Sequence, residues 1–212
     1  SLGYFGGLKN LLTLDLSKNL ISDLNETTFD KNLSGLNKLV LSNNQIAQIR
    51  ENAFAPLANL TDLDLSSNRV SKLTSKMFSG LGFCLKTLSL ANNQLSTLPG
   101  LLDDSLFFNL WKMTKLNLSG NRLSNLIINM FFGFGELIHS FMLDLSRNQI
   151  KLMPDSVVQF LARLVADLRL DLSNNQMSKI DPNTFYCAKS LQYLNLCGNT
   201  CPDVCVNQAI CH

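Results

Sequence analysis

The chain has 212 residues, a formal net charge of +2, 46% hydrophobic residues and only 16% charged residues. This composition favours a folded chain over a disordered one, and the balanced charge gives no reason to expect nucleic acid or an anionic membrane as a partner. No apolar run approaches the roughly 18–20 residues that a membrane-spanning helix needs. No secretory signal peptide opens the chain, so a secreted protein would be present here in a mature or trimmed form.

A short leucine pattern recurs along the whole chain. The form Leu-x-x-Leu-x-Leu-x-x-Asn is cleanest from Leu36 to Asn44, and it occurs eight times. The second leucines of successive copies are separated by 25, 24, 25, 28, 27, 27 and 24 residues. Recurrence at this period predicts a solenoid of stacked coils, because one copy alone cannot cover both of its faces.

Each copy predicts a short strand followed by a turn. The Leu-x-Leu pair has period two, so both side chains point to the same side of a strand, and the strands of successive coils are expected to form a parallel sheet. The Asn amide that follows can both donate and accept, and we expect a ladder of bonds to the backbone of the turn and of the next coil. The ladder residues are Asn19, Asn44, Asn68, Asn93, Asn121, Asn148, Asn175 and Asn199.

An aromatic column is expected on the outer side. It lies ten residues after each Asn and comprises Phe29, Phe54, Phe78, Phe131, Val158 and Phe185. In the fourth copy the count reaches Asp103, and a longer loop supplies Phe107 or Phe108 instead. The apolar insertion from Pro99 to Trp111 either packs on the outer core or contacts a partner.

The sixth and seventh copies depart from the pattern in the same way. Ser140 and Asp167 replace the first leucine, and Phe141 and Leu168 follow one position later. Both apolar residues alternate with the buried pair, which predicts longer strands in these two copies.

The residues between the buried leucines form the inner face. Its central positions are small and polar, as expected of a solvated sheet, and they lack the aromatic and Arg anchors of a strong interface. The flanking positions of repeats six to eight are richer, and a lateral or edge surface is the hypothesis for ligand binding. The candidate ligand-binding residues are Lys115, Phe141, Met142, Arg147, Arg169 and Tyr193.

The two ends differ. Residues 1–199 form the predicted array, whose N-terminal end has no cysteine-stapled cap, so we expect a longer ectodomain or a covering partner there.

Residues 200–212 form a short cysteine-rich segment. Its disulfide candidates, which allow three pairings, are Cys197, Cys201, Cys205 and Cys211. A zinc site with His212 is the alternative, although no Cys-x-x-Cys occurs. Cys84 and Cys187 are expected to be small buried residues.

Four triplets match the acceptor for N-glycosylation. They begin at Asn25, Asn32, Asn59 and Asn117. A repeat rich in Asn and Ser also makes such triplets freely, and Asn117 fits that explanation. Together with the cysteine cluster, they favour an extracellular or cell-surface location.

The full repeat, which adds Ile-x-x-Ile and Phe after the Asn and is seen from Leu36 to Phe54, resembles the "typical" leucine-rich-repeat class of extracellular proteins. Its irregular 27- and 28-residue copies resemble Toll-like receptor ectodomains. The resemblance implies an α/β-type solenoid, a right-handed horseshoe with a parallel sheet on the concave face and short helices or irregular chain on the convex side. It also implies recognition of a protein, glycoconjugate or pathogen-associated ligand by an innate-immune receptor, as a possible homo- or heterodimer. A secreted matrix or neuronal adhesion protein is the alternative.

Catalysis is not expected. The only histidines are His139 and His212, so nucleophilic catalysis with a histidine base has little to draw on, and neither a phosphate-binding glycine loop nor a His-x-x-x-His pair occurs. The aligned residues Asp15, Asp64, Asp144 and Asp171 are interpreted as a solvated repeat position. The sequence predicts a binding protein without cofactor or metal.

Overall fold

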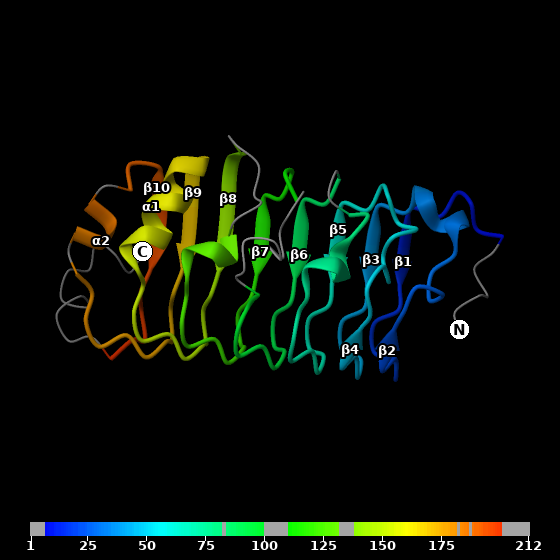
Figure 1. The fold of residues 1–212 in the computed structure, drawn as a ribbon, viewed down its shortest axis with the longest axis horizontal. Coiled ribbons are helices and arrows are strands. Elements are labelled where there is room, and N and C mark those ends of the chain that lie inside the picture. The colour runs from blue at the N-terminus through cyan, green and yellow to red at the C-terminus, as the bar shows by residue number, and fades with distance from the viewer. Residues whose placement is uncertain are drawn as a thin grey trace.

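The computed structural model describes residues 7–81, 84–99, 110–131, 138–181, 183–186 and 188–200. In these ranges the chain winds into stacked coils, and each coil adds one strand to a parallel sheet (Figure 1). The eight strands run in chain order along the sheet. They are β1 (Thr13–Asp15), β3 (Lys38–Val40), β5 (Asp62–Asp64), β6 (Thr87–Ser89), β7 (Lys115–Asn117), β8 (Ile138–Asp144), β9 (Val165–Asp171) and β10 (Leu191–Asn195). The predicted leucine-rich-repeat solenoid is therefore confirmed.

The strand register follows the leucine pattern. The second leucines of all eight copies are Cα partners from Leu14 through to Leu194. Those of the central coils, such as Leu88 and Leu116, are at most 1% exposed. The 28-residue step between these two leaves the register unshifted. Differences in repeat length are therefore absorbed outside the sheet.

β8 and β9 have seven residues each, whereas β1, β3, β5, β6 and β7 have three, which confirms the predicted longer strands. Ser140 pairs with Asp167 in register, and its hydroxyl lies 3.4 Å from the Asp167 carboxylate. Phe141 and Leu168 are at most 1% exposed. The extra strand length exists because these two side chains continue the buried alternation.

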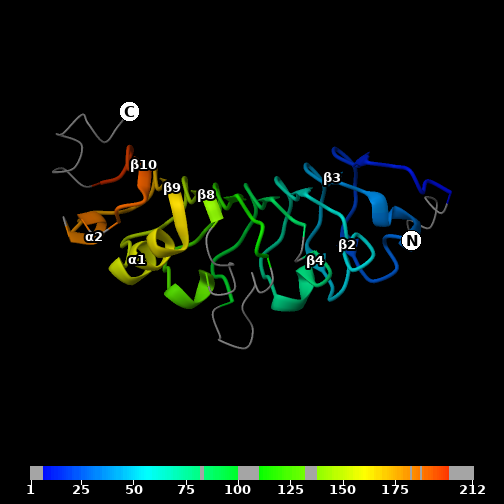
Figure 2. The same cartoon turned by 90° about the horizontal axis from the view of Figure 1, so that it is seen from above.

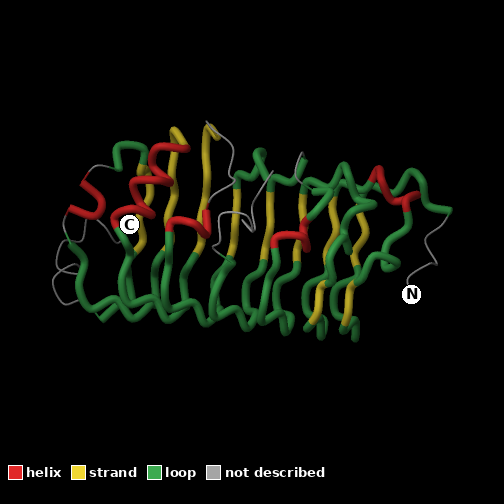
Figure 3. The backbone as a smooth tube through the Cα atoms, in the orientation of Figure 1, coloured by secondary structure: helices red, strands yellow, loops and turns green. Residues whose placement is uncertain are grey.

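The convex side carries the short helices, and two minor strands lie at the edge where the chain turns away from the sheet (Figures 2 and 3). These elements are β2 (Asp23–Leu24), η2 (Lys31–Gly35), β4 (Gln48–Ile49), η3 (Ser75–Phe78), η5 (Ile128–Phe131), α1 (Asp155–Leu164) and α2 (Asn183–Tyr186). In α1, Val157, Val158 and Leu161 are buried. Their spacing of one, three and four places them on one face of the helix, which packs on the coils.

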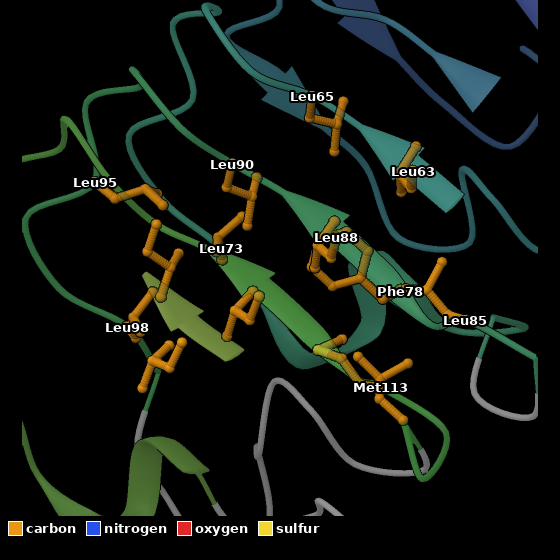
Figure 4. Packing of buried hydrophobic residues seen from close by; sticks show 14 of the residues in the cluster. Leu63, Leu65, Leu73, Phe78, Leu85, Leu88, Leu90, Leu95, Leu98 and Met113 are labelled. Carbon is orange, nitrogen blue, oxygen red and sulfur yellow. The ribbon is translucent and has the colours of Figure 1, made fainter. Parts of the chain in front are cut away.

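Leucines from the sheet and rings from the convex side meet in one continuous core, of which Figure 4 shows the central part. The ring of Phe54 is fully buried and stacks between Phe29 and Phe78, with centroid distances of 6.0 and 6.1 Å. Phe131 and Val158 are also buried, and Phe185 is half-buried. Phe107 and Phe108 lie outside the described residues.

The Asn side chains join the coils through backbone hydrogen bonds. The Asn121 amide donates to the carbonyls of Leu90 and Leu118, at 2.9 Å each, and its oxygen accepts from the Leu95 N–H at 3.0 Å. The same set of bonds repeats at Asn44, Asn68, Asn93, Asn148, Asn175 and Asn199. Asn19 is exposed, and its amide donates only to Leu16 and Ser17 of its own coil.

The residue before each ladder Asn adopts a left-handed backbone conformation, with φ between 54° and 73°. These residues are Lys18, Asn43, Ser67, Asn92, Gly120, Arg147, Asn174 and Gly198. Asn and Gly tolerate this conformation best, which explains why they hold five of the eight positions. At Gly120 there is a second reason, because a Cβ would lie 2.2 Å from the side-chain oxygen of Asn92.

The structure describes two of the six cysteines. Cys84 is half-buried, which corrects the prediction of a buried residue, because it lies in the turn before β6 rather than in a leucine column. Cys197 is also half-buried. Cys187, Cys201, Cys205 and Cys211 lie outside the described residues. None of the described helices is long and apolar enough to cross a membrane.

Candidate functional site on the concave face

Four of the candidate ligand-binding residues form one row on the concave face. In the sheet register Lys115 pairs with Met142, Met142 with Arg169, and Arg169 with Tyr193. Neighbouring strands lie about 4.8 Å apart, so the row spans roughly 14 Å. Lys115 and Arg169 are exposed, whereas Met142 and Tyr193 are half-buried. We call these four residues the β7–β10 row. It combines two cations, an aromatic ring and a thioether.

Phe141 is not part of this surface. Its side chain is only 1% exposed and belongs to the core, which corrects its prediction as a ligand-binding residue. The physical reason is the strand period, since Phe141 precedes Met142 and therefore points to the opposite side of β8. Arg147 is exposed, but it lies in the turn after β8 and not in the row.

A second row runs along the middle of the concave face and is built mainly from Asp and Asn. At six of its eight positions the side-chain oxygen accepts the backbone N–H two residues later. For Asp64 the donor is Ser66, at 2.9 Å. These acceptors are Asp15, Asp64, Asn117, Asp144, Asp171 and Asn195. Their common role is to close the turn at the end of each strand.

This turn-closing role is not among the predictions made from the sequence, although its signal is local. Asp-Leu-Ser occurs at 15–17, 64–66, 144–146 and 171–173, and a side-chain oxygen two residues before a free N–H predicts such a turn. At Asp15, hydrogen bonds from the Ser17 hydroxyl and backbone N–H lower the pKa of the carboxyl below its ordinary value. The main role of this row is therefore structural, and at Asp171 the second carboxylate oxygen is engaged as well, because it accepts from the Asn195 amide at 3.2 Å.

Two substitutions at Asp64 distinguish the turn-closing hydrogen bond from the negative charge of the carboxylate. We expect Asp64→Ala to lower the free energy of unfolding by about 1 kcal/mol, because the Ser66 N–H loses its acceptor. Asp64→Asn keeps that acceptor and should change stability by less than about 0.5 kcal/mol. Urea unfolding followed by circular dichroism measures both. Equal losses in the two variants would assign the effect to the charge instead of the turn.

The strand positions that face the concave side carry more carboxylates than cations: Asp15, Asp62, Asp64, Asp144 and Asp171 against Lys38, Lys115 and Arg169. Cations and carboxylates alternate around a shallow hollow of about 300 Å³, whose polar lining includes Lys38, Asp62, Asp64 and Lys115. Hydroxyl groups of Thr61 and Thr87 donate to Asp62. Further along, Arg169 pairs with Asp167, their Nε and Oδ1 atoms being 3.4 Å apart. Asp144 and Asp171 lie side by side on β8 and β9. This arrangement disfavours a polyanion on the sheet itself.

The four glycosylation candidates lie at different places. Asn25 is half-buried, and its oxygen accepts from the N–H and hydroxyl of Thr27. Asn32 is half-buried in η2, while Asn59 is exposed and donates to the Ser34 carbonyl. Asn117 lies on β7 in the middle of the concave face. Modification at these residues stays a prediction.

The described residues form no cluster of metal-ligating side chains. In the part of the chain that the structure describes, no three His, Cys, Asp or Glu side chains are placed to hold a metal ion. His139 is exposed, and His212 lies outside the described residues. Trp111, at the end of the apolar insertion, is 51% exposed.

Comparison with known proteins agrees with the fold. The sequence matches leucine-rich-repeat models at residues 31–70 and 142–200, and at residues 84–105 and 112–134. No curated protein matches the chain in sequence. Among solved structures it is similar to a chain in "Crystal structure of TLR13-ssRNA13 complex", with a TM-score of 0.65 and 30% identity. The match covers 91% of this chain but only 30% of that chain. This chain belongs to the leucine-rich-repeat proteins and is built like part of a Toll-like receptor.

Proposed function

We propose that this chain is a ligand-recognition module of a Toll-like receptor ectodomain, acting outside the cell or at its surface. The observation that carries the proposal is the β7–β10 row, which gathers Lys115, Met142, Arg169 and Tyr193 on adjacent strands. Arg and Tyr are the residues that most often dominate the energy of protein interfaces, and Met adapts its shape to a partner. The similarity to TLR13 supports a receptor role.

A protein ligand fits this row best. The row presents cations, while Asp144 and Asp171 lie directly beside it with one carboxylate oxygen each engaged in a turn. A partner with both acidic and basic groups matches this alternation, and such complementarity sets the register of an interface. No catalytic step and no cofactor is part of the proposal.

Single-stranded RNA is the second candidate. It is favoured by the TLR13 chain, whose structure was solved with a single-stranded RNA. The Tyr193 ring and the Arg169 guanidinium could stack with bases, as in other RNA-binding surfaces. The neighbouring carboxylates argue against it, because they repel phosphate groups.

The test compares two pairs of substitutions in the same strand positions. The chain is immobilised and exposed to a bacterial lipoprotein, a flagellar protein and a 13-nucleotide single-stranded RNA, and binding is followed by interferometry. We expect a protein of this panel to bind, and Arg169→Ala with Tyr193→Ala to weaken it at least about tenfold, as for two anchor residues. Thr13→Ala with Lys38→Ala, in β1 and β3, should change the affinity less than about twofold.

Two results would contradict the proposal. If no member of the panel binds the wild-type chain, the receptor role loses its support. If a ligand binds but both double variants bind it equally, the β7–β10 row is not the contact surface. RNA binding that depends on Arg169 and Tyr193 would favour the second candidate over the first.

A further inference from the structure

One edge of the solenoid carries cations in four of five consecutive coils. It is the edge on which β2 and β4 lie, where the chain turns away from the sheet (Figure 1). The residues around each ladder Asn of repeats three to seven, 67–72, 92–97, 120–125, 147–152 and 174–179, include six Lys or Arg and neither Asp nor Glu. All six cations are exposed, and we call them the basic edge: Arg69, Lys72, Arg122, Arg147, Lys151 and Lys179.

Backbone hydrogen bonds between neighbouring coils align the residues of this edge. The backbone N–H of Arg69 donates to Ile46 in the preceding coil, at 2.9 Å, and that of Arg122 donates to Leu95, at 2.8 Å. Gln149 and Gln176 make the same bond in the next two coils. Side chains at this position are therefore stacked at about 4.8 Å per coil, and five coils span roughly 19 Å.

The charge of the basic edge is not neutralised within the described residues. The ion pairs among the described residues involve Arg50, Lys76 and Arg169, and none of them involves an edge cation. The first two coils differ, because Asp23 stands at the position equivalent to Lys72 and pairs with Arg50 at 3.6 Å. Six of the chain's 18 cations lie on this edge, and the five windows contain none of its carboxylates, although the net charge is only +2. Such a one-sided field attracts an extended anion.

The uncharged neighbours indicate which anion fits. They are hydroxyl and amide side chains such as Ser71, Thr97, Asn125 and Gln149, and the five windows contain no aromatic residue. Surfaces for single-stranded nucleic acid combine cations with aromatic rings on which bases stack, and those rings are absent from these windows. Proteins that bind duplex RNA through its shape contact about 16 base pairs, a much longer stretch than this edge.

We propose that the basic edge binds a linear sulfated polysaccharide, on a surface separate from the concave face. Sulfate groups need cations and hydrogen-bond donors, and the edge offers both without a requirement for stacking. The five windows contain no Asn-x-Ser/Thr triplet, so N-linked glycans would not cover the edge.

The experiment measures binding of a fluorescent, size-defined heparin oligosaccharide to the 212-residue chain. We expect the variant with Arg69→Gln, Arg122→Gln and Lys151→Gln to bind at least about tenfold more weakly than wild type. The slope of log affinity against log salt should fall by about 2 to 3, since each lost contact removes about 0.7–0.9. The control carries Lys9→Gln, Lys31→Gln and Lys189→Gln, which remove the same charge from exposed positions elsewhere.

The control should keep the wild-type affinity within about twofold. Arg169→Ala with Tyr193→Ala should also leave heparin binding unchanged, which separates this inference from the proposed function. Equal weakening in the edge variant and its control would show attraction to net charge alone and overturn the proposal. So would tighter, edge-dependent binding of a single-stranded RNA that carries the same number of charges.

Discussion

We expect Asn121→Ala to lower the free energy of unfolding by about 3–5 kcal/mol, a large loss for the removal of a single polar side chain. Asn121 is only 7% exposed, and it satisfies the Leu95 N–H and the carbonyls of Leu90 and Leu118. Alanine leaves the Leu95 N–H buried without an acceptor, which costs about 1–3 kcal/mol. It also removes one of the two amide donors from each carbonyl, since Asn93 still donates to Leu90 and Asn148 to Leu118, at about 0.5–1.5 kcal/mol per lost bond.

The matched control is Asn19→Ala, which removes the same side chain from the first coil. Asn19 is exposed, and its amide donates only to carbonyls of its own coil, which water can reach. We expect a loss below about 1 kcal/mol. Urea unfolding of both variants, followed by circular dichroism, gives the comparison. A similar loss at the two positions would mean that bonds between coils do not carry the ladder's stability.

A comparable loss is expected from Phe54→Ala on the convex side. The Phe54 ring is fully buried between Phe29 and Phe78, so its removal leaves a cavity with a neighbouring ring on either side. Large-to-small changes of this kind cost about 3–5 kcal/mol, and each lost ring contact adds about 0.5–1.5 kcal/mol. Because each coil of a solenoid is stabilised by its neighbours, we expect the first three coils to lose protection against hydrogen exchange together.

Two further variants test the cause of this loss. Phe54→Leu keeps much of the volume and should cost about half as much as alanine. Phe185→Ala, in the same column but half-buried, should cost less than about 2 kcal/mol. If Phe185→Ala were as damaging as Phe54→Ala, the effect would not depend on the ring stack.

Four of the six candidate ligand-binding residues predicted from the sequence form the β7–β10 row, whereas the prediction for Phe141 is wrong. The alternation of Phe141 with Leu143 and Leu145 predicts a buried ring, yet the same residue is also among the predicted ligand contacts. The two interpretations exclude each other, because neighbouring residues of a strand face opposite sides. The structure places Phe141 in the core and Met142 on the surface.

The solenoid, the inward leucines, the Asn positions and the longer strands β8 and β9 follow from the amino-acid sequence alone. These features are local, because they depend on strand period and on the hydrogen-bonding capacity of single side chains. Which surface residues are neighbours depends on how the coils stack. Repeats of 24 to 28 residues do not show where their extra residues lie, and the register through Leu88 and Leu116 places them outside the sheet. The β7–β10 row and the basic edge arise from that stacking, since residues at equivalent positions of adjacent coils lie about 25 residues apart in sequence and about 5 Å apart in space.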